Sequence, residues 1–411
     1  MPSVLVTRFT LKSAGSSGKS VVGRQFRVLH CLRSPVGGLF RHVLDLARAQ
    51  IDAGCSVGIL ADSSTGGPSA DAKLAALAPD LALGVTRISM PRSIGLSDYS
   101  ALLGTQVLAD GMRADVLHGH GAKGGAYARL AARRLKLAGS QVRVLYTPHG
   151  GSLHYEPGTP QGLLFLGLEQ RLAGLTDGLI FESDYSRRVY ETKVGRPNCP
   201  VRVIANGLLA TDFIAHKPEI SASDVLFVGE LRKLKGVDVL LEALASITSP
   251  WAPTATIVGT GPDEAAFKAQ AVGLGLSARV TFAGALPAAM AFPKGKLLVV
   301  PSRAESFPYI VLEGAAAGMP MLASDVGGIP EIMAGGNTEL LIPGSIGDLS
   351  QKLTAFLSEP SRLQSRAIEL RQRVSEQFTA TRMADDVMAF YANVAANGPV
   401  ALQSTGILPA S

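Results

Sequence analysis

The sequence is short of cysteine, of long apolar runs and of clustered basic residues, and each shortage excludes a class of protein. Its cysteines are Cys31, Cys55 and Cys199, which form neither an even disulfide framework nor a metal-ligand spacing, so we expect buried reduced thiols. No run approaches the roughly 18 uncharged apolar residues that cross a bilayer. The N-terminal apolar patch is interrupted by Arg8 and Lys12 and lacks the core of a secretory signal, so we expect a cytoplasmic protein.

The charge balance limits the partners. Lys and Arg exceed Asp and Glu by 39 to 33, and this net charge of +6 is compatible with anionic substrates, with peripheral contact to an anionic membrane face, or with solubility alone. No basic run is interleaved with aromatic residues, so we expect no nucleic-acid partner. A hydrophobic content of 47% with 18% charged residues excludes a disordered chain.

A chain of 411 residues is long enough for two domains, and the hydrophobic pattern repeats accordingly. Residues 1–25 are rich in Ser, Gly and Lys and are expected to be a flexible extension. After them, short aliphatic runs alternate with helical patterns, which is typical of βαβ units and a parallel sheet. The strands expected in this first half are 26–32, 55–60, 115–120, 142–150, 177–183 and 201–207, with a helix over 43–54.

The same alternation restarts after a polar stretch at about residues 211–223. The strands expected in the second half are 224–230, 255–261, 278–284, 296–302, 320–324 and 339–344. We therefore predict an α/β protein with two doubly wound parallel sheets, in domains 26–207 and 208–378, then a helix over 379–396 and a flexible tail, 397–411. Ligands of such sheets lie beyond the carboxyl ends of the strands, which predicts a site in a cleft between the domains.

The most informative segment is 296–320, which is expected to be a buried strand, a loop and a helix. Ser306 is the expected N-cap and Pro308 suits the first turn. Glu305 then lies in the loop, and Glu313 lies about one and a half turns into the helix. The helix start offers N–H groups and a positive dipole to a diphosphate, while the carboxylates accept hydrogen bonds from hydroxyls. The alternative is that Glu305 is a solvated loop residue and that Glu313 is one half of a side-chain pair on the helix surface.

A basic loop follows the first strand of the second half. Arg232 and Lys235, with Lys233 between them, are placed to neutralise charge on a departing nucleoside diphosphate. The alternative is a solvated basic turn.

The first half has glycines and histidines at expected strand ends. Gly37 and Gly38 allow close approach of the backbone to a ligand but do not form the G-x-G-x-x-G fingerprint, and a plain tight turn is the alternative. His149 follows a strand and is expected at its rim, although a lone histidine is more often a structural hydrogen-bonding group. His118 and His120 also end a strand, but without identifiable third and fourth ligands they predict no zinc site.

Glu305, seven intervening residues and Glu313 resemble the paired-glutamate signature of retaining glycosyltransferases of family four, the group 1 enzymes with the GT-B fold. The resemblance covers about residues 26–396. It implies that Glu305 contacts hydroxyls of the transferred sugar and Glu313 the ribose of the donor. It also implies that amides near Ser306, Phe307 and Tyr309 meet the sugar or phosphate, and that the C-terminal helix packs back on the first domain.

The chain departs from the family pattern at two positions. The family commonly has Gly where Pro308 stands, and proline donates no amide hydrogen bond. It also has Arg directly after the glycine matching Gly229, where this chain has Glu230. Lys235 is retained, so Arg232 is the candidate to replace the missing cation.

The resemblance further implies that the Gly37–Gly38 loop faces the donor phosphates and that His149 contacts the transferred sugar. The predicted function is retaining transfer of a hexose-type sugar from a nucleoside diphosphate sugar to a sugar, lipid-linked or other hydroxyl acceptor, in polysaccharide or glycoconjugate synthesis, without metal or other cofactor. The alternatives are a nucleotide-sugar epimerase and a non-catalytic sugar-nucleotide-binding protein. The predicted catalytic residues are His149, Arg232, Lys235 and Glu305, and the predicted donor-binding residues are Gly37, Gly38, Ser306, Phe307, Tyr309 and Glu313.

Overall fold

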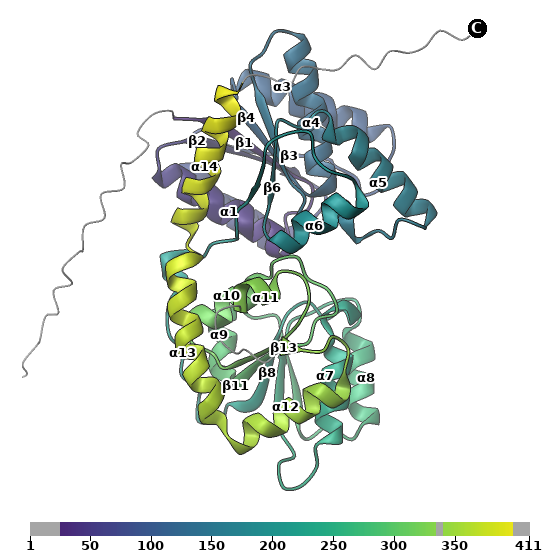
Figure 1. Ribbon diagram of the computed structural model, residues 1–411, viewed down its shortest axis with the longest axis vertical. Coiled ribbons are helices and arrows are strands. Elements are labelled where there is room, and N and C mark those ends of the chain that lie inside the picture. The colour runs from purple at the N-terminus through teal and green to yellow at the C-terminus, as the bar shows by residue number, and fades with distance from the viewer. Residues whose placement is uncertain (1–24, 334–339, 398–411) are drawn as a thin grey trace, which may run out of the picture.

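The computed structural model describes residues 25–333 and 340–397. The expected N-terminal extension and C-terminal tail lie, apart from residues 25 and 397, outside this range. The described chain forms two α/β halves that are stacked along the long axis of the molecule (Figure 1).

The first half is a seven-stranded parallel sheet in the order β3-β2-β1-β4-β5-β6-β7. Its strands are β1 (Arg27–Leu32), β2 (Ser56–Asp62), β3 (Val85–Ile88), β4 (Val116–His120), β5 (Arg143–Thr147), β6 (Gly178–Phe181) and β7 (Val201–Val203). Its helices are α1 (Gly37–Asp52), α2 (Gly67–Leu77), α3 (Ser97–Gly111), α4 (Gly121–Leu137), α5 (Pro160–Ala173) and α6 (Asp184–Lys193), with the 3-10 turns η1 (Ala78–Asp80) and η2 (Gly151–His154).

The second half is a six-stranded parallel sheet in the order β10-β9-β8-β11-β12-β13. Its strands are β8 (Ser223–Val228), β9 (Ala255–Val258), β10 (Val280–Gly284), β11 (Gly295–Val300), β12 (Met321–Ser324) and β13 (Leu340–Leu341). Its helices are α7 (Val237–Ser246), α8 (Glu264–Gly273), α9 (Ala288–Ala291), α10 (Tyr309–Ala316), α11 (Ile329–Met333), α12 (Ile346–Ser358) and α13 (Pro360–Gln377), with the 3-10 turns η3 (Ala210–Asp212), η4 (Lys233–Lys235) and η5 (Phe292–Lys294).

The predicted fold class is confirmed, because both sheets are parallel and carry a core on each face. Successive residues of β1 alternate between the two cores, with Val28 in one and Leu29 in the other. The same holds for β8, where Val225 and Leu226 belong to different cores. Strands covered on both faces read as nearly continuous apolar runs, which is why the sequence revealed them. The short edge strand β3 was not predicted, because its four residues are only partly buried.

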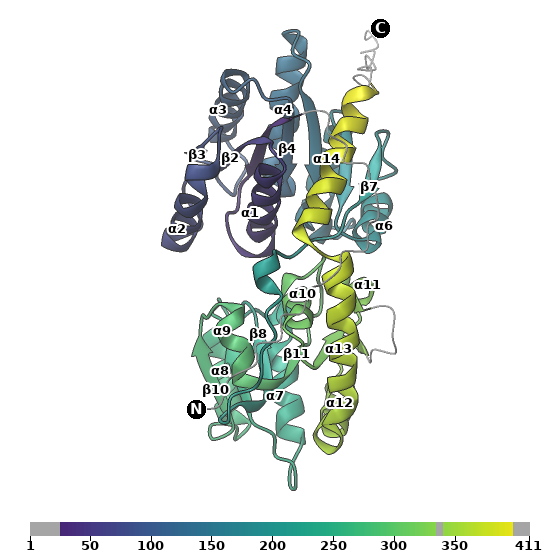
Figure 2. The same cartoon turned by 90° about the vertical axis from the view of Figure 1, so that its left-hand side faces the viewer.

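The two halves are connected where the chain crosses between them twice. Leu208, on the way out of the first sheet, forms a parallel bridge with Thr379. Its N–H donates to the carbonyl of Phe378 at 2.9 Å, and its carbonyl accepts from the N–H of Ala380 at 2.8 Å. Helix α14 (Ala380–Ala396) then packs beside α1 on the first half, as Figure 2 shows.

Thr379 caps α14 by accepting a hydrogen bond from the N–H of Arg382. The apolar side chains of α14, among them Val387 and Phe390, complete the core that α1 and α2 form on one face of the first sheet. The two crossing segments therefore form a paired connection between the halves.

We predict that Gly207→Ala destabilises this connection. A Cβ at Gly207 would lie 2.3 Å from the carbonyl oxygen of Thr379, which is backbone and cannot rotate away. Such overpacking costs about 1–3 kcal/mol of unfolding free energy, measurable by urea denaturation. Gly273→Ala is the matched control, because its Cβ would meet nothing within 4 Å. Equal stability of the two variants would contradict the prediction.

Candidate active site between the domains

Glu305 and Lys235 form an ion pair where two neighbouring strands of the second sheet end. The Nζ of Lys235 lies 2.6 Å from Oε1 of Glu305, and the hydroxyl of Ser302 donates to the same oxygen at 2.7 Å. The Glu305 side chain is 8% exposed. Among the described residues no hydrogen bond reaches its other oxygen, Oε2, which can therefore accept from a ligand hydroxyl.

Glycines allow these loops to pack so closely. Gly236, which follows Lys235, has a φ of +74°, and a Cβ there would lie 1.9 Å from the carbonyl oxygen of Pro301. A Cβ at Gly327 would lie 2.0 Å from the carbonyl oxygen of Glu305. Both positions need glycine, because no side chain fits between the two backbones.

The start of α10 differs from the sequence prediction. The helix begins at Tyr309, and Pro308 is in the N-cap position with an extended ψ of 126°, not in the first turn. Ser306 is not the N-cap: its hydroxyl donates to Glu182 Oε2 at 3.2 Å and lies 3.0 Å from the hydroxyl of Ser186. The Ser306 side chain therefore contacts the first domain, and the spacing of residues around Ser306 carries no information about Glu182 and Ser186.

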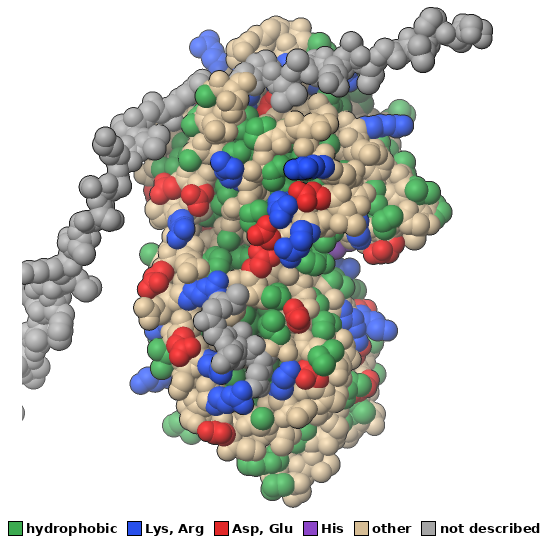
Figure 3. Space-filling model, in the orientation of Figure 1, with side chains coloured by type: hydrophobic (Ala, Val, Ile, Leu, Met, Phe, Trp, Pro, Cys, Tyr) green, Lys and Arg blue, Asp and Glu red, His purple; other side chains and the backbone are tan. Residues whose placement is uncertain are grey.

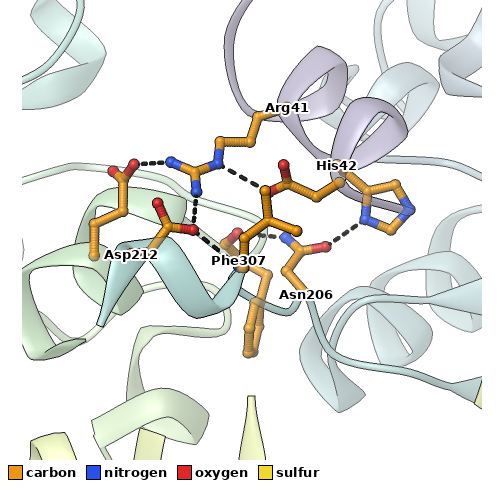
Figure 4. A network of polar contacts seen from close by, with 8 residues as sticks. Arg41, His42, Asn206, Asp212 and Phe307 are labelled. Atoms are coloured by element: carbon orange, nitrogen blue, oxygen red, sulfur yellow. Dashed lines mark hydrogen bonds and ion pairs between the residues drawn. The ribbon is translucent and has the colours of Figure 1, made fainter. Parts of the chain in front are cut away.

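Glu313 is paired across the domain boundary with Arg41 of α1. The same guanidinium contacts Asp212 at 2.6 Å and Asp45 at 3.0 Å, so it links three carboxylates (Figure 4). Burial raises the pKa of Glu313, and the positive charge of Arg41 partly opposes this shift. Arg41 was not expected from the sequence, because only the fold brings it to Glu313.

The predicted first-domain glycines also lie against this boundary. Gly37 and Gly38 are the first residues of α1, and a Cβ at Gly38 would lie 3.7 Å from the ring of Tyr309. The Tyr309 ring is buried and lies 5.1 Å from the Arg41 guanidinium. Phe307 is buried too, and its carbonyl accepts from the side-chain amide of Asn206 at 3.0 Å. The glycine loop and the start of α10 therefore face each other.

Arg232 does not join the Lys235–Glu305 pair. Its side chain is 52% exposed, and its ion pair is with Glu230 at 3.7 Å. His154, at the end of η2, lies within electrostatic reach of this basic loop: partial burial, Lys193 and Arg232 lower its pKa. His154 was not expected from the sequence; it follows Gly150 and Gly151, whereas His149 comes before them.

His149 is enclosed instead of projecting at the rim. Its backbone has a left-handed φ of 50°, and its side chain is 4% exposed. The ring Nδ1 lies 2.6 Å from Glu182 Oε1, and Nε2 lies 2.9 Å from His120 Nδ1. Although burial disfavours ionisation of Glu182, the interaction with His149 lowers its pKa to about 2. Glu182 is therefore a carboxylate at neutral pH and accepts a hydrogen bond from the Nδ1–H of His149.

The sequence suggested that His118 and His120 are an isolated pair, but the structure places further histidines beside them. His120 Nε2 lies 2.9 Å from His30 Nδ1, and His30 Nε2 lies 2.8 Å from Gln50 Oε1. The resulting buried histidine cluster consists of His30, His42, His118, His120 and His149. Strands β1, β4 and β5 are neighbours in the sheet, and this adjacency is the signal that links His30, His118, His120 and His149. His42 comes from α1.

Comparison with known proteins shows what the chain resembles. A model for glycosyltransferase family 4 matches residues 36–208, and a model for glycosyl transferases group 1 matches residues 222–359. A D-inositol 3-phosphate glycosyltransferase of Rhodococcus erythropolis is 34% identical over 188 residues, which are 42% of each chain. The match thus spans about two fifths of that relative. A glycogen synthase of Mycobacterium tuberculosis is 28% identical over 374 residues, covering 84% of this chain and 88% of the relative.

Solved structures share the fold. A sucrose-phosphate synthase of Thermosynechococcus elongatus superposes with a TM-score of 0.74 at 20% identity, over 91% of this chain and all of that one. Anabaena HepE, solved in complex with UDP and glucose, superposes with a TM-score of 0.73 at 20% identity, over 90% of this chain and all of that one. Within the described residues, no helix is long and apolar enough to cross a membrane.

The carboxylates around Arg41 should give a measurable dependence of stability on pH. Burial raises the pKa of Asp45 to about 6 from 3.8, with Arg41 opposing the shift and Asp212 adding to it. Between these values the folded state binds more protons than the unfolded state, so the free energy of unfolding falls as pH rises from about 4 to about 6. We expect Asp45→Asn to reduce the fall across that range by on the order of 1–3 kcal/mol in denaturation curves, leaving the contribution of Glu313.

Asp80→Asn is the control for this prediction. Asp80, in η1, pairs with Arg48 of α1, but both side chains are at least 40% exposed. Its replacement should leave the slope intact, and the same slope in Asp45→Asn as in the unmodified chain would contradict the prediction.

Proposed function

Because the chain belongs to the nucleotide-sugar-dependent glycosyltransferases of family four, we propose that it transfers a hexose to a hydroxyl acceptor with retention of the anomeric configuration. The observation that carries the proposal is the Lys235–Glu305 pair, a cation and a carboxylate held 2.6 Å apart at the carboxyl ends of β8 and β11. A departing diphosphate needs the cation, and sugar hydroxyls need the carboxylate.

In the proposed reaction the bond between the anomeric carbon and the β-phosphate oxygen breaks while the acceptor oxygen bonds to that carbon from the same face. The acceptor's proton passes to the departing phosphate oxygen, so no enzyme nucleophile is used. Charge builds up on the phosphate as the sugar becomes oxocarbenium-like. Lys235 and the N–H groups at the start of α10 would stabilise that charge without reorganising.

Glu305 would orient the sugar in this reaction. One of its oxygens is occupied by Lys235 and by Ser302, so the carboxylate is held in one rotamer. Its second oxygen is then available to hydroxyls of the hexose. The same lysine thus serves both the leaving group and the orientation of the sugar-binding carboxylate.

Glu313 would bind the ribose of the donor. Its buried carboxylate already shares Arg41 with Asp212 and Asp45. Because Arg41 comes from the first domain, a ribose bound at Glu313 would be contacted next to the domain boundary. Donor binding and the apposition of the two domains are coupled in this arrangement.

Arg232 is proposed as a secondary cation only. Its guanidinium is half exposed and paired with Glu230, so it would have to turn away from Glu230 to reach a diphosphate. The proposed chemistry needs no metal ion, because Lys235 and the helix start supply the positive charge.

The donor and acceptor are proposed from relatives. HepE has been solved with UDP-glucose, and the matched relatives include glycogen synthase, which supports a uridine or other nucleoside diphosphate hexose and a sugar-type acceptor. A lipid-linked acceptor and peripheral contact with an anionic membrane are compatible with the net charge of +6. On the face in Figure 3, Lys and Arg are interspersed with Asp and Glu over both halves, without the basic stripe of a nucleic-acid-binding protein.

Screening nucleotide sugars tests the proposed function. We expect a nucleoside diphosphate hexose at about 100 times its dissociation constant to add about 2.7 kcal/mol of stability in a thermal-shift assay. Incubation with that donor and a panel of sugar acceptors should then yield a glycoside whose anomeric configuration, read by NMR, is that of the donor. If the donor binds but is neither transferred nor slowly hydrolysed, the protein is only a binding protein. A product with inverted configuration would refute retention.

Two substitutions test the site. Lys235→Ala should lower kcat by on the order of 10²-fold or more, because a group that stabilises developing charge is lost. Glu313→Ala should chiefly weaken donor binding. Lys233→Ala is the control, since this neighbouring side chain is exposed. Near-normal kinetics for both Lys235→Ala and Glu313→Ala would disprove the site assignment.

A further inference from the structure

The buried histidine cluster contains three rings whose outward nitrogens are each held by a separate partner. His149 Nδ1 donates to the carboxylate of Glu182 at 2.6 Å. His42 Nδ1 lies 2.8 Å from Asn206 Oδ1, and the orientation of that amide is set by its own donation to the Phe307 carbonyl. His42 therefore donates from Nδ1, and its Nε2 carries a lone pair.

The third ring, His120, is held in the same manner. His30 Nε2 donates to Gln50 Oε1 at 2.8 Å, so His30 Nδ1 is an acceptor. His120 Nε2, 2.9 Å away, must then be the donor to His30. This leaves a lone pair on His120 Nδ1, which faces His149 Nε2 at 2.9 Å.

These three rings also lie close to one another. One ring nitrogen from each of His42, His120 and His149 lies within 4.8 Å of those of the other two. His120 Nδ1 and His149 Nε2 lie 2.9 Å apart, and two nitrogens that both carry a lone pair need a cation between them at this distance. A proton would join His120 to His149, but it would leave His42 Nε2 as it stands, fully buried with no hydrogen-bond partner.

We propose that His42, His120 and His149 form a binding site for a divalent transition-metal ion, Zn²⁺ foremost. Three neutral imidazoles are a zinc ligand set that leaves a fourth position for water or substrate. A metal satisfies all three lone pairs at once. At Zn–N distances of about 2.1 Å, tetrahedral ligands lie about 3.4 Å apart, so the 2.9 Å between His120 and His149 would widen on metal binding.

The surroundings of the three rings match those of metal-bound histidines. Such histidines almost always donate their other ring N–H to a carboxylate, carbonyl or similar acceptor, which fixes the tautomer and orients the ring. Glu182, Asn206 and His30 fill these places here. The other triplet of close nitrogens, His30, His118 and His120, fits less well, because both nitrogens of His118 are already bonded, to Tyr391 and Thr147.

The site is distinct from the chemistry proposed above, which uses Lys235 and Glu305. Glu182 connects the two, since its other oxygen accepts from Ser306 at the loop before α10. Metal binding is measured without donor or acceptor, so its failure would leave the transfer reaction untouched, and the reverse also holds.

The experiment uses the full chain, stripped with a chelator and dialysed. Calorimetric titration with Zn²⁺ should show one site, and Co²⁺ should give the visible absorption of a tetrahedral complex. His42→Gln should abolish both signals, and Glu182→Gln should weaken Zn²⁺ binding about 10–100-fold, as loss of an outer partner does. His216→Gln is the control, because it removes one histidine outside the cluster.

Circular dichroism and thermal unfolding check that each variant is folded, and either of the two site variants suffices if the other does not fold. Absence of stoichiometric Zn²⁺ binding to the unmodified chain would overturn the proposal and assign the space between His120 and His149 to a shared proton. Unchanged affinity in His42→Gln would overturn it as well, because the metal would then lie elsewhere.

Discussion

The ionised carboxylate of Glu182 is the constraint on which the site depends. It is buried at the end of β6, and its two oxygens point to different domains: one accepts from His149 of the first, the other from Ser306 of the second. A buried charge is tolerated only when hydrogen bonds satisfy it, and breaking such a set by removing one partner is strongly destabilising. The position of the loop before α10 and the tautomer of His149 are therefore fixed together.

A second polar centre, Arg41, lies at the same boundary. Here one cation is shared by several carboxylates, whereas Glu182 is one carboxylate shared by several donors. One guanidinium serves three carboxylates, and burial keeps the pKa of both Asp45 and Glu313 raised. Because burial disfavours the ionised form of both carboxylates, the cluster holds the domains less firmly than the number of its contacts suggests. A donor hydroxyl that takes up one carboxylate oxygen changes this balance directly, which makes the Arg41 cluster the natural point at which binding influences domain apposition.

The sequence was sufficient for the architecture and for the residues that follow strands, but not for their partners. Buried parallel strands are long apolar runs, so both sheets were predicted, and Lys235 and Glu305 were singled out because each follows a strand. The half-buried β3 carried too weak a pattern. Arg41, Glu182 and Asn206 lie far in sequence from the groups they contact, and no local spacing encodes a contact across 272 residues such as Arg41 with Glu313. Ser306 was misassigned as an N-cap for the same reason.

The role expected of His149 changes with this geometry. Resemblance assigned it to the transferred sugar, yet both ring nitrogens are engaged, Nδ1 by Glu182 and Nε2 by His120. In this arrangement the ring has no nitrogen to offer a sugar hydroxyl, whether a proton or a metal ion lies between His149 and His120. Any contact with the sugar would have to come from its backbone or its carbon edge. The left-handed backbone at φ 50°, unfavourable for a residue with a side chain, persists because the ring is fixed on both sides.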